Sequence, residues 1–146
     1  MRSFVTAVSL ASVVALTGCS AVTPVDPGDQ QACTIWSKAE QAMVQTVAII
    51  VELAKDPAGL SEDVATEFNT KRNELLAAYD EAKKVATSED LKTALENGIN
   101  KDSVVYYDLA GATNERIQES MAAVSTIVAT CGVAGVDVSD VLGTKK

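Results

Sequence analysis

Between residues 31 and 131 the apolar residues recur at intervals of three and four, and this spacing constrains the fold more than any other feature. Such a period is typical of one buried face of an α-helix. Helix-stopping or helix-capping residues interrupt it at Asp-Pro-Ala-Gly (56–59), at Thr87 or Ser88, and at Gly132. Alanine and valine dominate the apolar set, which suits close helix-on-helix contact. The sequence therefore predicts an all-α chain.

The number of helices depends on where the third one ends. A break at Gly111, with Thr113 as the next N-cap, gives a small antiparallel bundle of four helices, over 31–55, 61–86, 88–110 and 113–131. In that arrangement Gly98 lies inside a helix, at a cost of about 1 kcal/mol. The alternative is three long helices.

The first nineteen residues have the order of an export signal. Arg2 precedes an apolar run over 4–16, which is too short to span a bilayer comfortably. The segment ends in Leu16-Thr17-Gly18-Cys19. This resembles the lipobox of bacterial lipoprotein precursors, in which an aliphatic residue and two small residues precede an invariant cysteine.

The resemblance implies that residues 1–18 are a signal peptide that is cut off, and that Cys19 carries the lipid. Two or more acyl chains, from a diacylglycerol group and a palmitate, would make the anchor stable. It would place the protein on the cell membrane or outer membrane, facing away from the cytoplasm. Residues 19–30 contain Pro24, Pro27 and Gly28 and are expected to form a flexible stalk.

The two remaining cysteines, Cys33 and Cys131, are expected to form a disulfide, because an exported chain meets an oxidising environment. Their Cα atoms must then lie within about 7 Å of each other. At a rise of 1.5 Å per residue, four alternating helices bring the ends together, whereas a break at Gly98 overshoots. The bridge thus favours four helices, with a bundle over 31–132 and a tail over 133–146.

The composition removes most catalytic and ligand-binding chemistry. There is no histidine, which excludes Ser-His and Cys-His nucleophile pairs and most zinc sites. The charge is acidic, with 12 Lys and Arg against 20 Asp and Glu, so nucleic acid is an improbable partner. Exposed acidic pairs such as Glu115 and Glu119 are interpreted as a solvated face. We expect no enzyme, metal or cofactor.

One stretch suggests a partner. Residues 42–54 are apolar around most of the helix circumference, with Val44, Ala48 and Val51 on a second side. The favoured interpretation is the most buried helix of an uneven bundle. The alternative is an exposed apolar face that binds a partner or a second copy of the chain.

These observations favour a non-enzymatic binding module for an envelope partner. By analogy of class, exclusion or immunity against phages or plasmids is one such role. The second hypothesis is a structural, self-associating spacer of the envelope.

Overall fold

The computed structural model describes residues 25–53, 55, 61–107 and 112–142. Four α-helices account for most of them, and the described part of the chain contains no strand. The helices are α1 (Pro27–Leu53), α2 (Glu62–Val85), α3 (Glu89–Tyr107) and α4 (Asn114–Val133), followed by a short 3₁₀ turn, η1 (Ser139–Leu142). The predicted all-α fold of four helices is confirmed.

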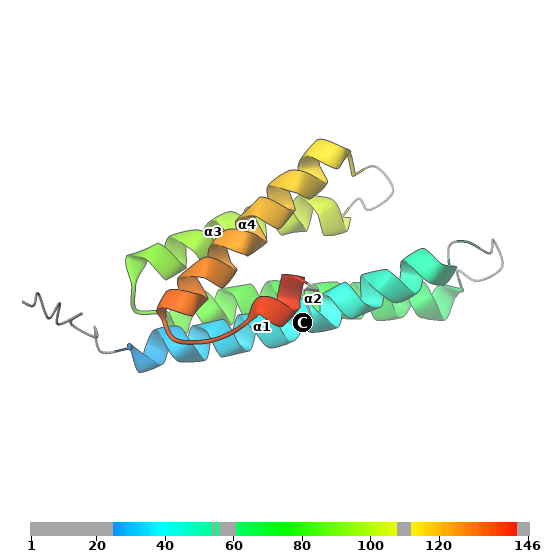
Figure 1. Ribbon diagram of the computed structural model, residues 1–146. Helices are drawn as coiled ribbons and strands as arrows, with labels where there is room; N and C mark the ends of the chain where they lie inside the picture. Colours follow the sequence, from blue (N-terminus) through cyan, green and yellow to red (C-terminus); the bar gives the residue numbers. More distant parts are fainter. Residues whose placement is uncertain (1–24, 54, 56–60, 108–111, 143–146) are drawn as a thin grey trace, which may run out of the picture.

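The helices form two antiparallel hairpins, one of α1 and α2 and one of α3 and α4 (Figure 1). The hairpins pack on each other mainly through α2 and α3, whereas α1 and α4 make few contacts. Figure 1 shows them joined near the α2–α3 connection and diverging toward their far ends. We call the far part of the α1–α2 hairpin, residues 47–53 and 62–74, the hairpin tip.

Helix boundaries follow the predicted caps, with one correction. Ser61 and Thr113 accept hydrogen bonds from the backbone N–H groups of Val64 and Arg116, as N-caps do. The prediction of a stalk reaching residue 30 is wrong, because α1 already begins at Pro27. Proline is tolerated in the first turn, where its missing N–H would have no partner in the helix. Asp26 caps this start by accepting the Gly28 N–H at 2.8 Å.

The break between the third and fourth helices lies between Tyr107 and Asn114, so the three-helix alternative is wrong. Gly111 lies outside the described residues. Gly98 is buried inside α3, where the helix passes close to its neighbours. A Cβ atom there would lie 2.6 Å from Ile127 Cδ1 and 2.9 Å from Tyr79 Cε1. The close approach of α3 to α2 and α4 explains a glycine in mid-helix.

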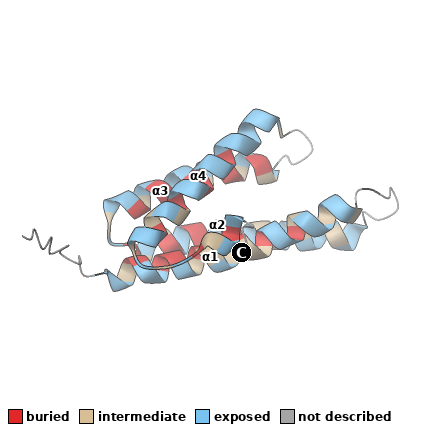
Figure 2. Ribbon diagram, viewed as in Figure 1, coloured by how far each residue is buried: buried red, intermediate tan, exposed pale blue. Residues whose placement is uncertain are grey.

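The core occupies the region where the two hairpins meet (Figure 2). Its largest fully buried apolar side chains are Trp36, Tyr79, Met43, Leu75, Leu91, Leu95 and Ile127. The chain after α4 also contributes, because Val138 and Val141 are buried and η1 packs against α1 and α4. The hairpin tip contains no buried residue.

Candidate functional site

The predicted anchor cannot be placed, because Cys19 and the signal segment lie outside the described residues. Within the part of the chain that the structure describes, no helix has the length and apolar character needed to cross a membrane. The remaining predicted residues, the cysteine pair and the second side of α1, are both described.

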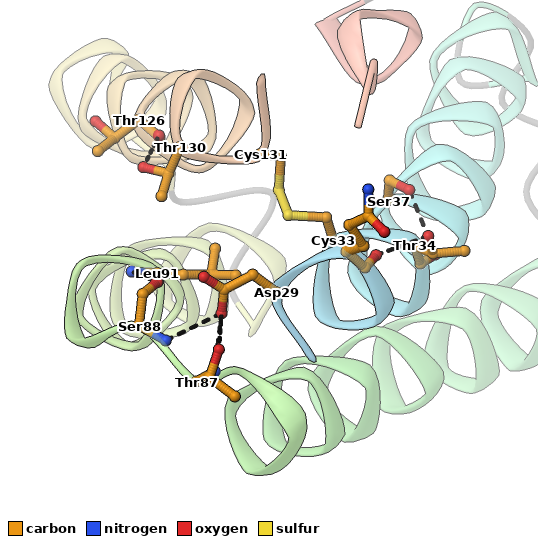
Figure 3. Close-up of a disulfide and its surroundings, with 11 residues drawn as sticks. Asp29, Cys33, Thr34, Ser37, Thr87, Ser88, Leu91, Thr126, Thr130 and Cys131 are labelled. Carbon is orange, nitrogen blue, oxygen red and sulfur yellow. Dashed lines mark hydrogen bonds between the residues drawn. A yellow bond between two sulfur atoms is a disulfide. The ribbon is translucent and has the colours of Figure 1, made fainter. Parts of the chain in front are cut away.

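Cys33 and Cys131 form the predicted disulfide, with their Cα atoms 5.6 Å apart. It joins α1 to α4 near the end where the hairpins meet, and both residues are fully buried (Figure 3). Asp29 strengthens the same end, since its Oδ1 accepts the backbone N–H groups of Thr87 at 2.8 Å and Ser88 at 3.1 Å. One end of the molecule is therefore fixed by a covalent bond and by these hydrogen bonds.

The carboxyl group of Asp29 is charged at neutral pH. Burial by itself would raise its pKa, but the hydrogen bonds from Ser88 and Thr87 outweigh burial and hold the pKa below its usual value. Asp29 thus links the start of α1 to the α2–α3 connection as an anion.

The second side of α1 within residues 42–54 is exposed, so this stretch is not the buried part of the bundle that the favoured interpretation expected, although α1 contributes buried residues from Asp29 to Thr46. Val44 and Val51 are 38% and 54% exposed, and Ala48 between them is also exposed. The three residues follow each other at i, i+4 and i+7, so they form one continuous strip, which we call the tip face. Ile49, about 100° around the helix from Ala48, is also 56% exposed.

The tip face is uncovered because of how the hairpins diverge. The buried residues of α1 end at Thr46, and those of α2 begin at Leu75. Beyond these positions α1 and α2 contact mainly each other, and a two-helix hairpin buries only the stripe between its helices. Ala48 and Val51, which lie beyond Thr46 on the outer side of α1, therefore have no third helix to cover them, and Val44 faces the same side one turn earlier.

A second group of residues is polar and lies inside the core. We call Glu40, Tyr79, Asp102, Tyr106 and Ser120 the core polar cluster. The carboxylate of Asp102 accepts hydrogen bonds from the Tyr79 hydroxyl and, at 2.5 Å, from the Ser120 hydroxyl. The Tyr106 hydroxyl donates to Glu40 Oε1 at 3.3 Å, whereas Glu40 Oε2 has no hydrogen-bond partner.

The electrostatics of this cluster keep one carboxyl neutral. Burial, and then the negative charge of Asp102, raise the pKa of Glu40 to about 8. Burial also raises the pKa of Asp102, and its two hydroxyl donors offset part of that rise. Asp102 has the better hydrogen bonding and so holds the negative charge, while Glu40 keeps a proton at neutral pH. The pKa values of Tyr79 and Tyr106 are raised by burial and by the carboxyls, so both phenols remain donors.

Sequence reasoning missed this cluster, although a signal was present. Glu40 lies four residues after Trp36 and three before Met43, on the buried stripe of its helix. Asp102 lies four residues after the buried Gly98 and three before Val105. A carboxyl at an apolar position of the helical period indicates a buried acid. The predicted solvated acids behave as expected, since Glu115 is exposed and Glu119 pairs with Lys101 at 2.8 Å.

The adjacent tyrosines of α3 divide as their spacing requires. Tyr106 points into the core polar cluster, and Tyr107 is 63% exposed. The Arg72 guanidinium stacks on the Tyr107 ring at 4.5 Å from its centroid, which joins α2 to the end of α3.

The structure also contains a groove of about 830 Å³ between the start of α1, α3 and α4. Its polar lining includes Asp26, Asp29, Asp90, Asn97, Thr126 and Thr130. The groove is open to solvent, and the Asp29 carboxylate is already bonded to the α2–α3 connection. Ligand pockets bury most of their ligand and are more enclosed than this groove. Among the described residues, no group of three or more acidic or cysteine side chains could hold a metal ion.

No family model, curated protein or solved structure matches this chain. The assignment of function therefore depends on the residues and geometry described above.

Proposed function

We propose that this chain is an exported, lipid-anchored protein of the cell envelope that acts as a non-enzymatic binding module. Its lipid attachment would be at Cys19, in the lipobox-like segment Leu16-Thr17-Gly18-Cys19. Its binding surface would be the tip face, Val44, Ala48 and Val51, which contacts an apolar surface of another envelope protein.

The exposure of the tip face carries this proposal. An apolar strip that its own fold leaves uncovered is typical of a protein–protein contact. Its position also fits, because Val44 and Val51 lie about 25 and 36 Å along α1 from Pro27. A tether before Pro27 would therefore hold the start of α1 near the membrane, while the tip face lies toward the far end of the helix.

The tip face also favours a second candidate function, a structural spacer that self-associates. An apolar strip can pair with the same strip of a second copy about a two-fold axis. The two functions differ in the identity of the molecule that covers Val44, Ala48 and Val51, and the experiment on this face is designed to separate them.

The anchor is tested by feeding cells an alkyne analogue of palmitate and separating membrane from soluble fractions. The wild-type chain should incorporate the label and stay with the membrane. Cys19→Ala should lose the label and leave the membrane fraction. Label on Cys19→Ala, or no label on the wild type, would contradict lipid attachment at this residue.

The binding face is tested with a photo-crosslinking amino acid at position 48 in intact cells, with the same probe at position 133 as a matched control. Val133 is 86% exposed but lies at the other end of the molecule. A binding module should give one heteromeric product from position 48, and a spacer should give crosslinked copies of itself. Equal, diffuse crosslinking from both positions would contradict a specific face.

Two substitutions check the same face. Val44→Lys and Val51→Lys should abolish the position-48 product while leaving the melting temperature within a few degrees of wild type, because exposed positions tolerate polar residues. Val133→Lys should leave the product unchanged. If the lysine variants unfold, the face is part of the core and the proposal fails.

A further inference from the structure

The core polar cluster has an arrangement that goes beyond a binding face. Each of the four helices contributes to it: α1 Glu40, α2 Tyr79, α3 Asp102 and Tyr106, and α4 Ser120. Glu40 and Asp102 are 1% and 0% exposed. The cluster therefore joins the two hairpins through their interiors, between the disulfide-linked end and the hairpin tip.

The cluster contains two acids and no base. Among the described residues, no lysine or arginine forms an ion pair with either carboxyl. The hydrogen-bond donors are the hydroxyls of Tyr79, Tyr106 and Ser120. Two buried carboxylates without a cation cannot both be ionised at low cost. η1, which also packs against α1, carries Asp140, an acid that could not balance a second charge.

We propose that the core polar cluster is a proton-dependent joint, which holds the two hairpins together while Glu40 is protonated and lets them separate when Glu40 and Asp102 are both charged.

The way the hairpins would separate depends on the end of the molecule that carries the disulfide. The Cys33–Cys131 disulfide and the bonds from Asp29 to Thr87 and Ser88 do not depend on the cluster. Each hairpin is also held by its own helix–helix packing. Loss of the joint should therefore rotate the hairpins about the disulfide-linked end, which breaks the contact of Arg72 with Tyr107, rather than unfold them.

Opening would enlarge the apolar surface next to the tip face. Tyr106 of α3 is partly buried against the core and donates its hydroxyl to Glu40 of the other hairpin. Its ring would become accessible when the hairpins part. If the protein lies outside the cytoplasm, as proposed, a rise in external pH would open the joint and so strengthen the binding of an apolar partner. The joint itself does not depend on the proposed anchor or partner.

The direction of the pH dependence follows from linkage. Burial and Asp102 raise the pKa of Glu40 from 4.5 to about 8, so the folded, closed form binds a proton that the open form releases. The contribution of protonated Glu40 to the stability of the closed form is complete below about pH 4.5 and is lost as the pH rises toward about 8. Closure should weaken with rising pH across this window.

The test measures the distance between the hairpins from about pH 5 to about pH 10, in the protein as cells make it, with the disulfide intact. Spin labels on noncanonical amino acids at Asn69 of α2 and Gln118 of α4, both exposed, avoid new cysteines. The wild-type distance should increase as the pH rises from about 4.5 to about 8 and should level off above that, with the pH dependence of a single proton. Glu40→Gln keeps the acceptor for Tyr106 without the charge, and should stay closed throughout. Glu81→Gln, at an exposed position of α2, should behave as wild type.

A wild-type distance that does not change over this range would overturn the proposal, as would the same transition in Glu40→Gln. Because Glu40→Gln could fail to fold, the wild-type chain is also titrated by NMR of ¹³C-labelled glutamate side chains. A buried carboxyl that titrates above pH 7 supports the joint. If every glutamate titrates near its ordinary value of 4.5, Glu40 holds no proton at neutral pH and the joint does not exist.

Discussion

Reduction of the Cys33–Cys131 disulfide should destabilise the domain by about 4–5 kcal/mol. The two cysteines are 98 residues apart, so the bond closes a loop that includes almost the whole folded region. In the chain-entropy description, opening such a loop restores conformational freedom to the unfolded chain in proportion to the logarithm of loop length. For a domain of this size, the loss corresponds to a fall in melting temperature of about 15–20 °C.

The assay is urea unfolding followed by circular dichroism, with and without a phosphine reductant. Mass spectrometry checks that the bond is intact or fully reduced. Reduction keeps both sulfur atoms in the core, so it isolates the cross-link from side-chain packing. The variant Cys33→Ala/Cys131→Ala should be at least as destabilised as the reduced protein, because it also loses buried volume, and it should not respond to reductant.

A loss below about 2 kcal/mol on full reduction would refute the reasoning, because it would mean that the unfolded chain gains little freedom. A peptide map under non-reducing conditions that lacks the Cys33–Cys131 linkage would refute it more directly. Either result would also remove the fixed end that the proposed opening of the hairpins requires.

Three further substitutions test the packing and the hydrogen bonds that join the hairpins, with Gly132→Ala at the position that has no close neighbour. In urea unfolding, Gly98→Ala should destabilise by about 1–3 kcal/mol, because its methyl group would lie against Ile127 and Tyr79. In the same assay Gly132→Ala, with no atom within 4 Å of the added Cβ, should instead stabilise by about 0.5 kcal/mol. Asp29→Ala should cost about 2 kcal/mol at neutral pH, because the N–H groups of the α2–α3 connection lose their acceptor. Since the pKa of Asp29 lies below its usual 3.8, its contribution is present above that pH and disappears as the carboxyl is protonated. Wild type and Asp29→Ala should therefore converge in acid, and an equal difference at all pH values would contradict this account.

The helices and their caps could be predicted from local chemistry. Thr113 was expected as an N-cap and acts as one, and Ser61, at the expected start of the second helix, does the same. The start of α1 could not be predicted, because Pro27 and Gly28 are compatible both with a flexible stalk and with the first turn of a helix. The glycine at position 28 is explained by a tertiary contact, because a Cβ there would lie 2.6 Å from the Val85 carbonyl oxygen. Only a glycine lets α1 lie so close to the end of α2.

The disulfide could be predicted because few cysteines were available and helix length follows from residue count. The tip face could be identified as a strip, but its exposure could not. Val44 and Val51 have the same character whether a third helix covers them or not. Their exposure follows from the divergence of the two hairpins, and the spacing of apolar residues along the sequence does not predict that divergence.

By itself, the sequence predicted an all-α chain, favoured four helices over three and predicted the pairing of Cys33 with Cys131, because hydrophobic period, capping and helix length can be read along the chain. Only the tertiary structure decided which carboxyls are buried together and which apolar residues stay uncovered. Glu40 and Asp102 are 62 positions apart, and the pKa of Glu40 is raised only because four helices bring the two carboxyls into one buried interior. The physical reason is that burial and charge–charge interaction depend on distance in space, which helical spacing along one segment does not fix.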